Sequence, residues 1–167
     1  MSKEENNMNP EYMANRLDIK SIFRCMMEGG YYPTYEKTHI LFDIDENTAV
    51  VEHEEGVVSI RIFFSIDESA YDLFLEASNV TMSETFIVKP VVLNDRENIM
   101  FSFEMMCDTV KEFKKFFPRG VAKLTETLML HKREMKRLML TRKMSSATIS
   151  ATEDNFIISS KDLKPLT

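Results

Sequence analysis

The chain has few of the residues on which specialised sites and scaffolds depend. Its 167 residues include two cysteines, four glycines, three histidines and no tryptophan. Two cysteines are too few for the disulfide framework of a small secreted domain. None of the glycines stands in a phosphate-loop or dinucleotide-binding pattern. The sequence therefore excludes a disulfide-rich scaffold and the common nucleotide-binding loops.

Long apolar runs are also missing. No stretch approaches the roughly 18 apolar residues that a membrane span needs. The first seven residues are polar and acidic, unlike the basic start and apolar stretch of a secretory signal. We therefore expect a cytoplasmic protein with no membrane partner, in which Cys25 and Cys107 are reduced thiols in apolar surroundings.

What is present is the composition of an ordinary globular protein, 44% hydrophobic and 29% charged. The length suits one domain that buries a core of its own. We expect a flexible N-terminus over residues 1–9, a single α+β domain over residues 10–143, and a loosely ordered tail over residues 144–167 that is rich in Ser and Thr.

The charges are unevenly distributed along the chain. Residues 1–110 hold 8 Lys and Arg against 21 Asp and Glu, a net −13, whereas residues 111–143 hold 11 against 3, a net +8. Residues 144–167 hold 2 against 3, which brings the whole chain to −6. An acidic body followed by a basic helical segment indicates association with an acidic partner, with nucleic acid, or with the chain's own acidic surface.

The spacing of apolar residues predicts an α+β fold with a five-stranded antiparallel sheet and helices packed against it. Alternation is strongest over residues 57–66, where Val58, Ile60 and Ile62 share one face with Phe64 and Ile66. The predicted elements are a helix over residues 10–28, a three-stranded meander over 38–45, 49–54 and 57–66, a helix between Asp67 and Ser83, a two-stranded hairpin over 85–93 and 99–104, and a long helix from Thr109 to about Arg142.

Prolines and glycines predict where these elements begin, bend and end. Asn9-Pro10 is typical of a helix start and Gly29-Gly30 of a helix end. Pro90 places its strand at a sheet edge or a bulge, because proline has no N–H for the ladder. Pro118 predicts a kink or a short break in the last helix. The helix over residues 119–142 would be ~36 Å long, so we expect its far end to project or to pack on another subunit.

The acidic sequence Asp43-x-Asp45-x-Asn47, followed by Glu54, matches much of a calcium-loop pattern. However, Thr48 occupies the position where the sharp turn needs glycine, and the flanking residues alternate as strands do. We therefore interpret these acids as the outward residues of a hairpin, and we expect no metal and no other cofactor.

The three histidines, His39, His53 and His131, lie in three different predicted elements. A zinc protease motif needs two histidines one turn apart on a helix, so this motif is absent. If His39 and His53 faced the same side of the sheet, they could form a metal-dependent hydrolase site with nearby acids, and this alternative stays open. The sequence has no nucleophile elbow and neither cysteine has the setting of a reactive thiolate, so we expect no enzyme.

The basic helical segment is the feature that most directly indicates a contact surface. Two basic pairs stand four residues apart and line adjacent helix faces, with methionines between them. Methionine side chains fill irregular core gaps and also suit surfaces that adapt to partners. We expect this segment to bind a partner through Lys132, Arg133, Met135, Lys136, Arg137 and Met139. Nucleic acid is the alternative, since the cations would displace phosphate counterions, although no stacking aromatics are interleaved.

The order of the predicted elements resembles the YbjN-like and type III secretion chaperone-like fold over about residues 10–140. The features that match are the helix closed by Gly29-Gly30-Tyr31, the strand pair 40–45 and 49–54, the alternation over 57–64, the helix over 67–82, the hairpin over 86–104 and the closing helix. This resemblance implies a small acidic protein, usually dimeric, that binds another protein or a segment of it without catalysis. The basic last helix with its proline and the polar tail depart from the family pattern.

These observations together predict a non-enzymatic protein-binding module, or chaperone-like regulatory adaptor, that holds a partner polypeptide as a homodimer. The expected recognition surface is the open face of the sheet together with the helix over residues 119–142. Two alternatives remain, a nucleic-acid-associated regulator that uses the basic helix and a metal-dependent hydrolase with a site near His39 and His53.

Overall fold

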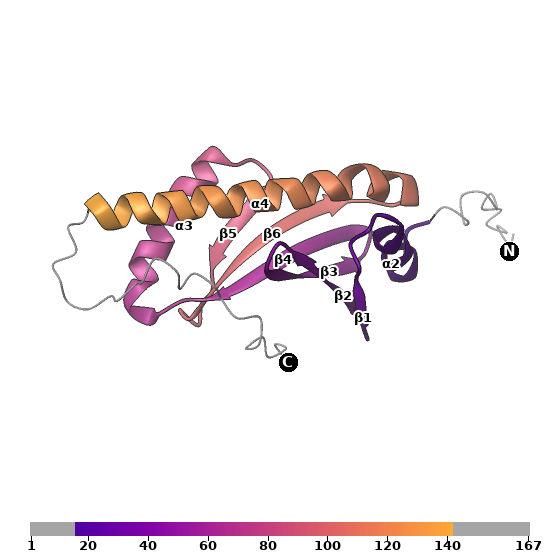
Figure 1. Cartoon of the computed structure of the whole chain (residues 1–167), viewed down its shortest axis with the longest axis horizontal. Coiled ribbons are helices and arrows are strands. Elements are labelled where there is room, and N and C mark those ends of the chain that lie inside the picture. Colours follow the sequence, from indigo (N-terminus) through magenta and orange to yellow (C-terminus); the bar gives the residue numbers. More distant parts are fainter. Residues whose placement is uncertain (1–15, 142–167) are drawn as a thin grey trace, which may run out of the picture.

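A computed structural model, shown in Figure 1, describes residues 16–141. The predicted N-terminal segment 1–9, the predicted helix start at Asn9-Pro10 and the predicted tail 144–167 lie outside the described residues. Within these residues the chain forms helices packed against an antiparallel sheet, which confirms the predicted α+β class. Helix α4 runs along the sheet, with α2 near one end and α3 near the other (Figure 1).

Within residues 16–141 the sheet has six strands, where the sequence predicted five. Their order in space is β1-β2-β3-β4-β6-β5, and all neighbours are antiparallel. The additional strand β1 has three residues, too few for an alternating pattern to show in the sequence. The strands are β1 (Thr34–Glu36), β2 (His39–Ile44), β3 (Asn47–Glu54), β4 (Val57–Ser65), β5 (Val88–Val92) and β6 (Asn98–Met106).

Tight turns join the strands of the meander, as predicted. Between β3 and β4, Glu55 and Gly56 have φ of 48° and 79°. Positive φ at both central residues is what a two-residue hairpin turn of the favoured twist requires. Between β2 and β3 the turn residues are Asp45 and Glu46. Strand β5 lies at the sheet edge, which confirms the prediction from Pro90.

Helix α2 (Ile19–Glu28) begins later than predicted. Arg16 forms an antiparallel bridge with Thr109, and the Leu17 N–H donates to the carbonyl of Asp108 at 2.8 Å. Arg16 and Leu17 therefore pair as strand residues do and Asp18 is the N-cap, so the prediction of helix over residues 16–18 is wrong.

Reciprocal hydrogen bonds set the start of α2. The Asp18 side chain accepts a hydrogen bond from the Ser21 N–H at 2.7 Å, and the Ser21 hydroxyl accepts one from the Asp18 N–H at 2.9 Å. This capping box satisfies two donors that the first helical turn leaves free. At the other end, Gly29 caps the helix and Gly30 has φ 78°, which confirms the predicted stop.

The second predicted helix forms as a short 3-10 turn, η1 (Glu68–Ala70), followed by α3 (Tyr71–Glu84). Asp67 caps the 3-10 turn by accepting from the Ser69 N–H at 2.8 Å, as expected of its position. Leu73 and Ala77 lie on the buried side of α3, whereas Leu75 is 39% exposed.

Helix α4 (Val110–Thr141) passes through Pro118 without a break, so of the predicted kink or short break, the break is wrong. Pro118 removes the hydrogen bond that would reach back to the carbonyl of residue 114. The Pro118 side chain is exposed, so water has access beside that carbonyl. On the core-facing side of the helix, Phe113 and Phe117 are 1% exposed. Burial of these two rings therefore offsets the cost of the proline.

A glycine allows α4 to approach the sheet at this point. Gly120 lies directly on the ring of Phe103 in β6, and a β-carbon at position 120 would overlap three of its ring atoms. Phe103 is itself 6% exposed and packed in the core. The close contact between α4 and β6 thus depends on a residue without a side chain.

The far end of α4 packs inside the protein. Met135 and Leu138 form a small buried cluster with Leu73 and Ala77 of α3. The prediction that this end projects, or packs on another subunit, is therefore wrong for its buried side. Helix α3 supplies the cover that the sheet is too short to give.

Candidate functional site

The two faces of the sheet differ in what covers them. One face packs against α2, α3 and α4 and supplies the core, including Val58, Ile60 and Ile62 of β4 as predicted. No helix of residues 16–141 packs on the other face, which we call the open face. Residues paired directly across an antiparallel ladder point to the same side, so the register identifies its members. Two neighbouring rows on it are Leu41–Val50–Arg61–Ser102–Lys89 and Phe63–Met100–Val91.

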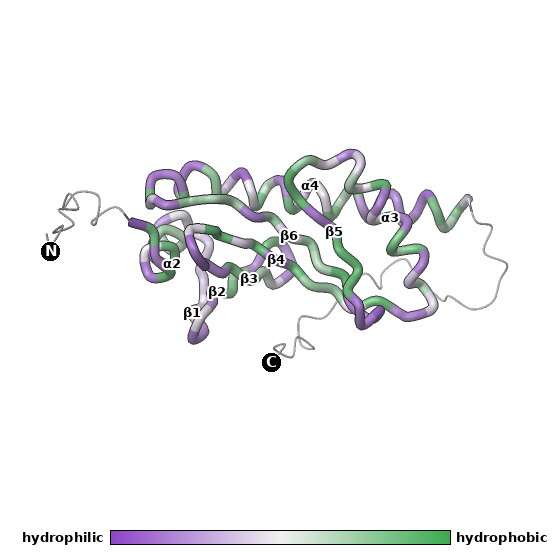
Figure 2. The backbone as a smooth tube through the Cα atoms, turned by 180° about the vertical axis from the view of Figure 1, so that it is seen from behind, coloured by the Kyte–Doolittle hydropathy of each residue, from purple (hydrophilic) through white to green (hydrophobic). Residues whose placement is uncertain are grey.

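Apolar side chains lie on the open face without joining the core. Leu41, Val50, Phe63 and Met100 are half-buried and Val91 is 38% exposed, and none of the five belongs to the core cluster. Apolar colour along β4, β6 and β5 is visible in Figure 2. We call Phe63, Met100 and Val91, which cross three adjacent strands, the apolar strip.

The other end of the open face is hollowed. A hollow of about 730 Å³ lies over β3, β4 and the end of β6. Its lining includes the row Glu52–Ser59–Glu104, in which a serine stands between two glutamates on neighbouring strands. Ser59 is 5% exposed although no helix of residues 16–141 packs on this face. Its small side chain therefore forms the floor of the hollow.

Acidic side chains surround the hollow. Arg61 is ion-paired with Glu52 across the β3–β4 ladder. Its Nε is buried and, among the described residues, has no hydrogen-bond partner. The carboxylates of Glu54, Glu55 and Glu104 also line the hollow, and none of the three forms an ion pair with a residue in the range 16–141. The hollow therefore has a surplus of negative charge.

The register rules out a shared site for His39 and His53. Ile40 pairs with Val51, so His39 lies opposite Glu52 on the open face, whereas His53 pairs with Val58 and points to the helix side. His39 contacts Glu36 at 3.8 Å. The pKa of His53 is lowered, chiefly by burial. The hydrolase alternative required both histidines on one side, and the structure contradicts it.

No group of three or more His, Cys, Asp or Glu side chains within residues 16–141 is arranged to hold a metal ion. The acids of the calcium-like sequence lie at the β2–β3 hairpin, where the Thr48 hydroxyl donates to Asp43 at 3.1 Å. The hairpin interpretation of these residues is confirmed.

Both cysteines are free and buried in the core. Burial raises the pKa of the Cys107 thiol to about 11, with a further contribution from the nearby Glu112 carboxylate, and burial also raises the pKa of Cys25. A thiol with a raised pKa is a poor nucleophile at neutral pH.

The six residues predicted to bind a partner divide into buried and exposed positions. Met135 is 4% exposed and Met139 packs against the small cluster between α3 and α4, so neither presents its side chain as a free surface. The four basic residues, Lys132, Arg133, Lys136 and Arg137, are exposed.

Acidic groups of the chain itself engage part of this basic segment. Arg133 contacts Glu84 of α3 at 3.4 Å and Glu134 at 3.5 Å, and Arg137 donates to Glu134 at 2.7 Å. The hydrogen bond from Arg137 is the main cause that lowers the pKa of Glu134. Of the three associations left open by the charge pattern, the chain's own acidic surface accounts for Arg133 and Arg137.

A buried polar pair between α3 and α4 was not predicted. His131, 4% exposed, lies 3.2 Å from the Ser78 hydroxyl through its Nε2 and packs on the rings of Phe74 and Phe101. The sequence contained one signal, since His131 occupies a position in the apolar series of the last helix. The partner Ser78 carries no such signal.

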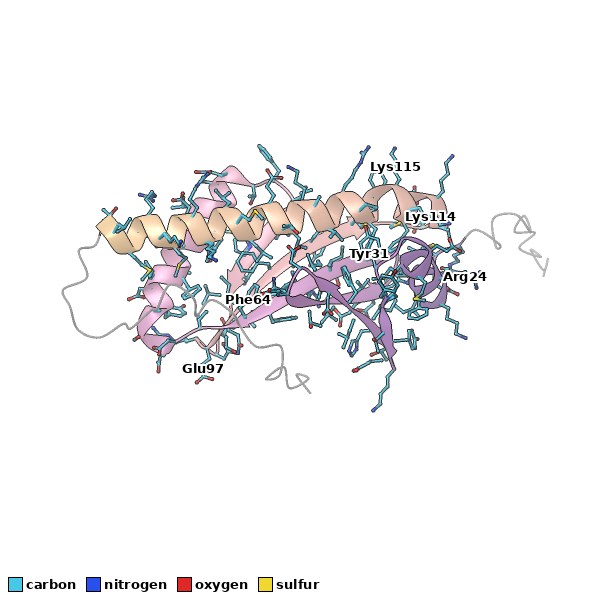
Figure 3. The ribbon with its side chains drawn as sticks, viewed as in Figure 1. Arg24, Tyr31, Phe64, Glu97, Lys114 and Lys115 are labelled. Atoms are coloured by element: carbon cyan, nitrogen blue, oxygen red, sulfur yellow. The ribbon has the colours of Figure 1, made fainter. Side chains whose placement is uncertain are left out.

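A second row of basic residues on α4 can be recognised only once the exposed positions of the helix are known. Lys111, Lys115, Arg119 and Lys123 follow one another at four-residue spacing and are all exposed. Lys115 points away from the sheet (Figure 3). Lys114, in contrast, turns to Glu28 of α2 and binds it at 2.8 Å.

None of the helices in the described range has the length and apolar character of a membrane-crossing segment. No protein-family model matches the sequence, and no curated protein matches it. Solved structures do match. One is YbjN from E. coli, described as a candidate transcription regulator, with a TM-score of 0.58 and 8% identity over 66% of this chain and 88% of that chain. At this identity the likeness concerns the fold, and it confirms the resemblance to the YbjN-like fold.

Proposed function

We propose that this chain is a non-enzymatic regulatory or adaptor module that holds a partner polypeptide against the open face of its sheet. The observation that carries the proposal is the apolar strip of Phe63, Met100 and Val91, which crosses three strands on a face that no helix of residues 16–141 covers. The homodimer implied by the fold resemblance stays a prediction.

The size of the uncovered apolar surface suits a reversible contact. Complete burial of a Val, Leu, Phe or Met side chain contributes about 1.5–3 kcal/mol. Four of the five apolar residues described above are already half-buried, so each has only part of this left to gain, whereas Val57 and Met106, which also lie on this face, are 36% and 87% exposed. After the entropy cost of association, such a surface supports a complex of moderate affinity.

Selection of binding peptides from a random display library, with the full-length chain as bait, tests this function. We expect peptides whose binding is lost in the variant Phe63→Ser, because this change removes the largest side chain of the apolar strip. The matched control is Phe86→Ser, which removes the same ring from a residue that is 99% exposed in the α3–β5 connection. Peptides that depend on Phe86 and not on Phe63, or no selected peptides at all, would contradict the proposal.

Nucleic-acid binding is the second candidate, and the exposed row Lys111, Lys115, Arg119 and Lys123 on α4 favours it. Lys111, Lys115 and Arg119 form no ion pair with any residue of the described part of the chain. If this row binds phosphates, affinity for DNA must fall steeply as salt rises, because counterions are released on binding. Absence of salt-dependent DNA binding would remove this candidate.

A further inference from the structure

The open face combines an apolar end and an acidic end within reach of one short segment of polypeptide. Phe63 and Ser59 lie on the same strand, β4, on the same side and four residues apart. At ~3.3 Å per residue the apolar strip and the hollow are therefore about 13 Å apart. An extended segment spans this distance with residues i and i+4, which also share one side of a strand.

The hollow has room for a cationic group between its carboxylates. Adjacent strands lie ~4.8 Å apart, so Glu52 and Glu104, on either side of the β4 row, are separated by about 10 Å at the backbone. Ser59 between them leaves the space above the floor open. The described residues supply one cation, Arg61, to a lining that contains four glutamates. The hollow therefore keeps a net negative charge, which the charge of a bound cation would offset.

We propose that the open face takes a cationic, amphipathic polypeptide segment, with a lysine or arginine side chain in the hollow among Glu52, Glu54 and Glu104 and an apolar side chain on the strip of Phe63, Met100 and Val91. This inference rests on the proposed function, since it names the chemistry of the partner held at the same face. Charge complementarity selects the partner, and the apolar contact supplies most of the affinity. The surplus of carboxylates around the hollow steers a cation toward this face.

Binding of three matched synthetic peptides to the full-length chain tests the inference. The first peptide carries Lys at one position and Leu four residues later, repeated along its length, the second replaces every Lys by Glu, and the third replaces every Lys by Gln. We expect the lysine peptide to bind at least about tenfold more tightly than the other two at low salt, and this preference to shrink as salt rises.

Variants of residues in the hollow test whether the preference for the lysine peptide originates there. The double variant Glu54→Gln with Glu104→Gln leaves the Arg61–Glu52 pair intact, and we expect it to lose about tenfold in affinity for the lysine peptide. The control is Glu46→Gln with Glu97→Gln, two exposed acids in hairpin turns at the opposite end of the strands, where Glu97 is seen in Figure 3. The control makes the same change in net charge, and we expect less than about a twofold loss from it.

Each contrary result has a distinct meaning. Equal or tighter binding of the glutamate or glutamine peptide, still lost in Phe63→Ser, overturns the cationic partner and leaves the proposed function standing. Binding that no open-face variant reduces overturns both. Self-association of the chain that Phe63→Ser abolishes would show a second copy on the open face, and would overturn the inference as well.

Discussion

Replacement of Phe117 by alanine is expected to lower the free energy of unfolding by about 3–5 kcal/mol. The Phe117 ring is 1% exposed and lies at the centre of an aromatic cluster. It contacts the rings of Tyr31 at 5.0 Å, Phe42 at 5.5 Å and Phe113 at 4.7 Å between centroids. These rings come from the segment after α2, from β2 and from α4, so the change removes the contact that joins α4 to the other two.

Phe116 provides the matched control, because it is the neighbouring phenylalanine on the same helix. Its ring is half-buried beside Lys115, and we expect Phe116→Ala to cost about 1 kcal/mol. Urea unfolding of both variants measures the difference, with Phe117→Leu as a milder change that keeps the protein folded. Equal losses for Phe116→Ala and Phe117→Ala would show that α4 is not anchored as described.

The second large effect is a loss of stability in weak acid that originates at His131. Burial lowers the pKa of His131 from 6.5 to about 4, against a smaller opposing effect of a hydrogen bond with the Phe74 backbone. Between pH 6.5 and about pH 4, His131 is protonated in the unfolded chain and neutral in the folded chain. The contribution of His131 is therefore fully present above pH 6.5 and is lost progressively as the pH falls to about 4. At 1.36 kcal/mol per pKa unit, the loss amounts to roughly 3 kcal/mol.

Urea unfolding from neutral pH to pH 4 measures this loss, and His131→Gln isolates it. The variant keeps a polar side chain toward Ser78 but cannot titrate, so we expect a flatter dependence of its unfolding free energy on pH. His53→Gln is the comparison, because His53 is only half-buried and its lowered pKa accounts for a smaller part of the slope. A proton titration of His131 in the folded state near pH 6.5 would contradict the argument.

The strands and their faces were predictable because alternation reports burial directly. The residues of β4 predicted to face the core do so, and Pro90 marked the edge strand β5. The pairing register of β2 and β3 determines which side of the sheet each residue faces, and alternation alone did not fix it for the histidines. With Asp45 and Glu46 as the turn, Ile44 pairs with Asn47 and the two strand histidines must point to opposite sides. The sequence did not fix the length of the turn, and a turn of three residues would have placed both histidines on one side, so this side assignment stayed open until the structure fixed the turn.

The errors about α4 share a physical origin. Pro118 predicts a break from local cost alone, but tertiary burial of Phe113 and Phe117 decides whether the helix continues. Likewise the sequence around Met135 does not distinguish a buried from an exposed methionine, because its burial depends on contact with α3. The contact of Arg133 with Glu84 and the hollow over Ser59 also depend on long-range packing, so no local sequence pattern predicts them.

The position of a bound peptide distinguishes the open face of the sheet from the other surfaces of the protein. The measurement is the change in backbone amide chemical shifts of the isotope-labelled full-length chain, titrated with a peptide selected for binding. We predict that the changes concentrate on β4 and β6, at Ser59, Phe63, Met100 and Ser102, and leave the exposed Lys136 of α4 unaffected. Changes confined to α4 or to the α3–β5 connection would contradict the claim that the open face of the sheet is the contact surface.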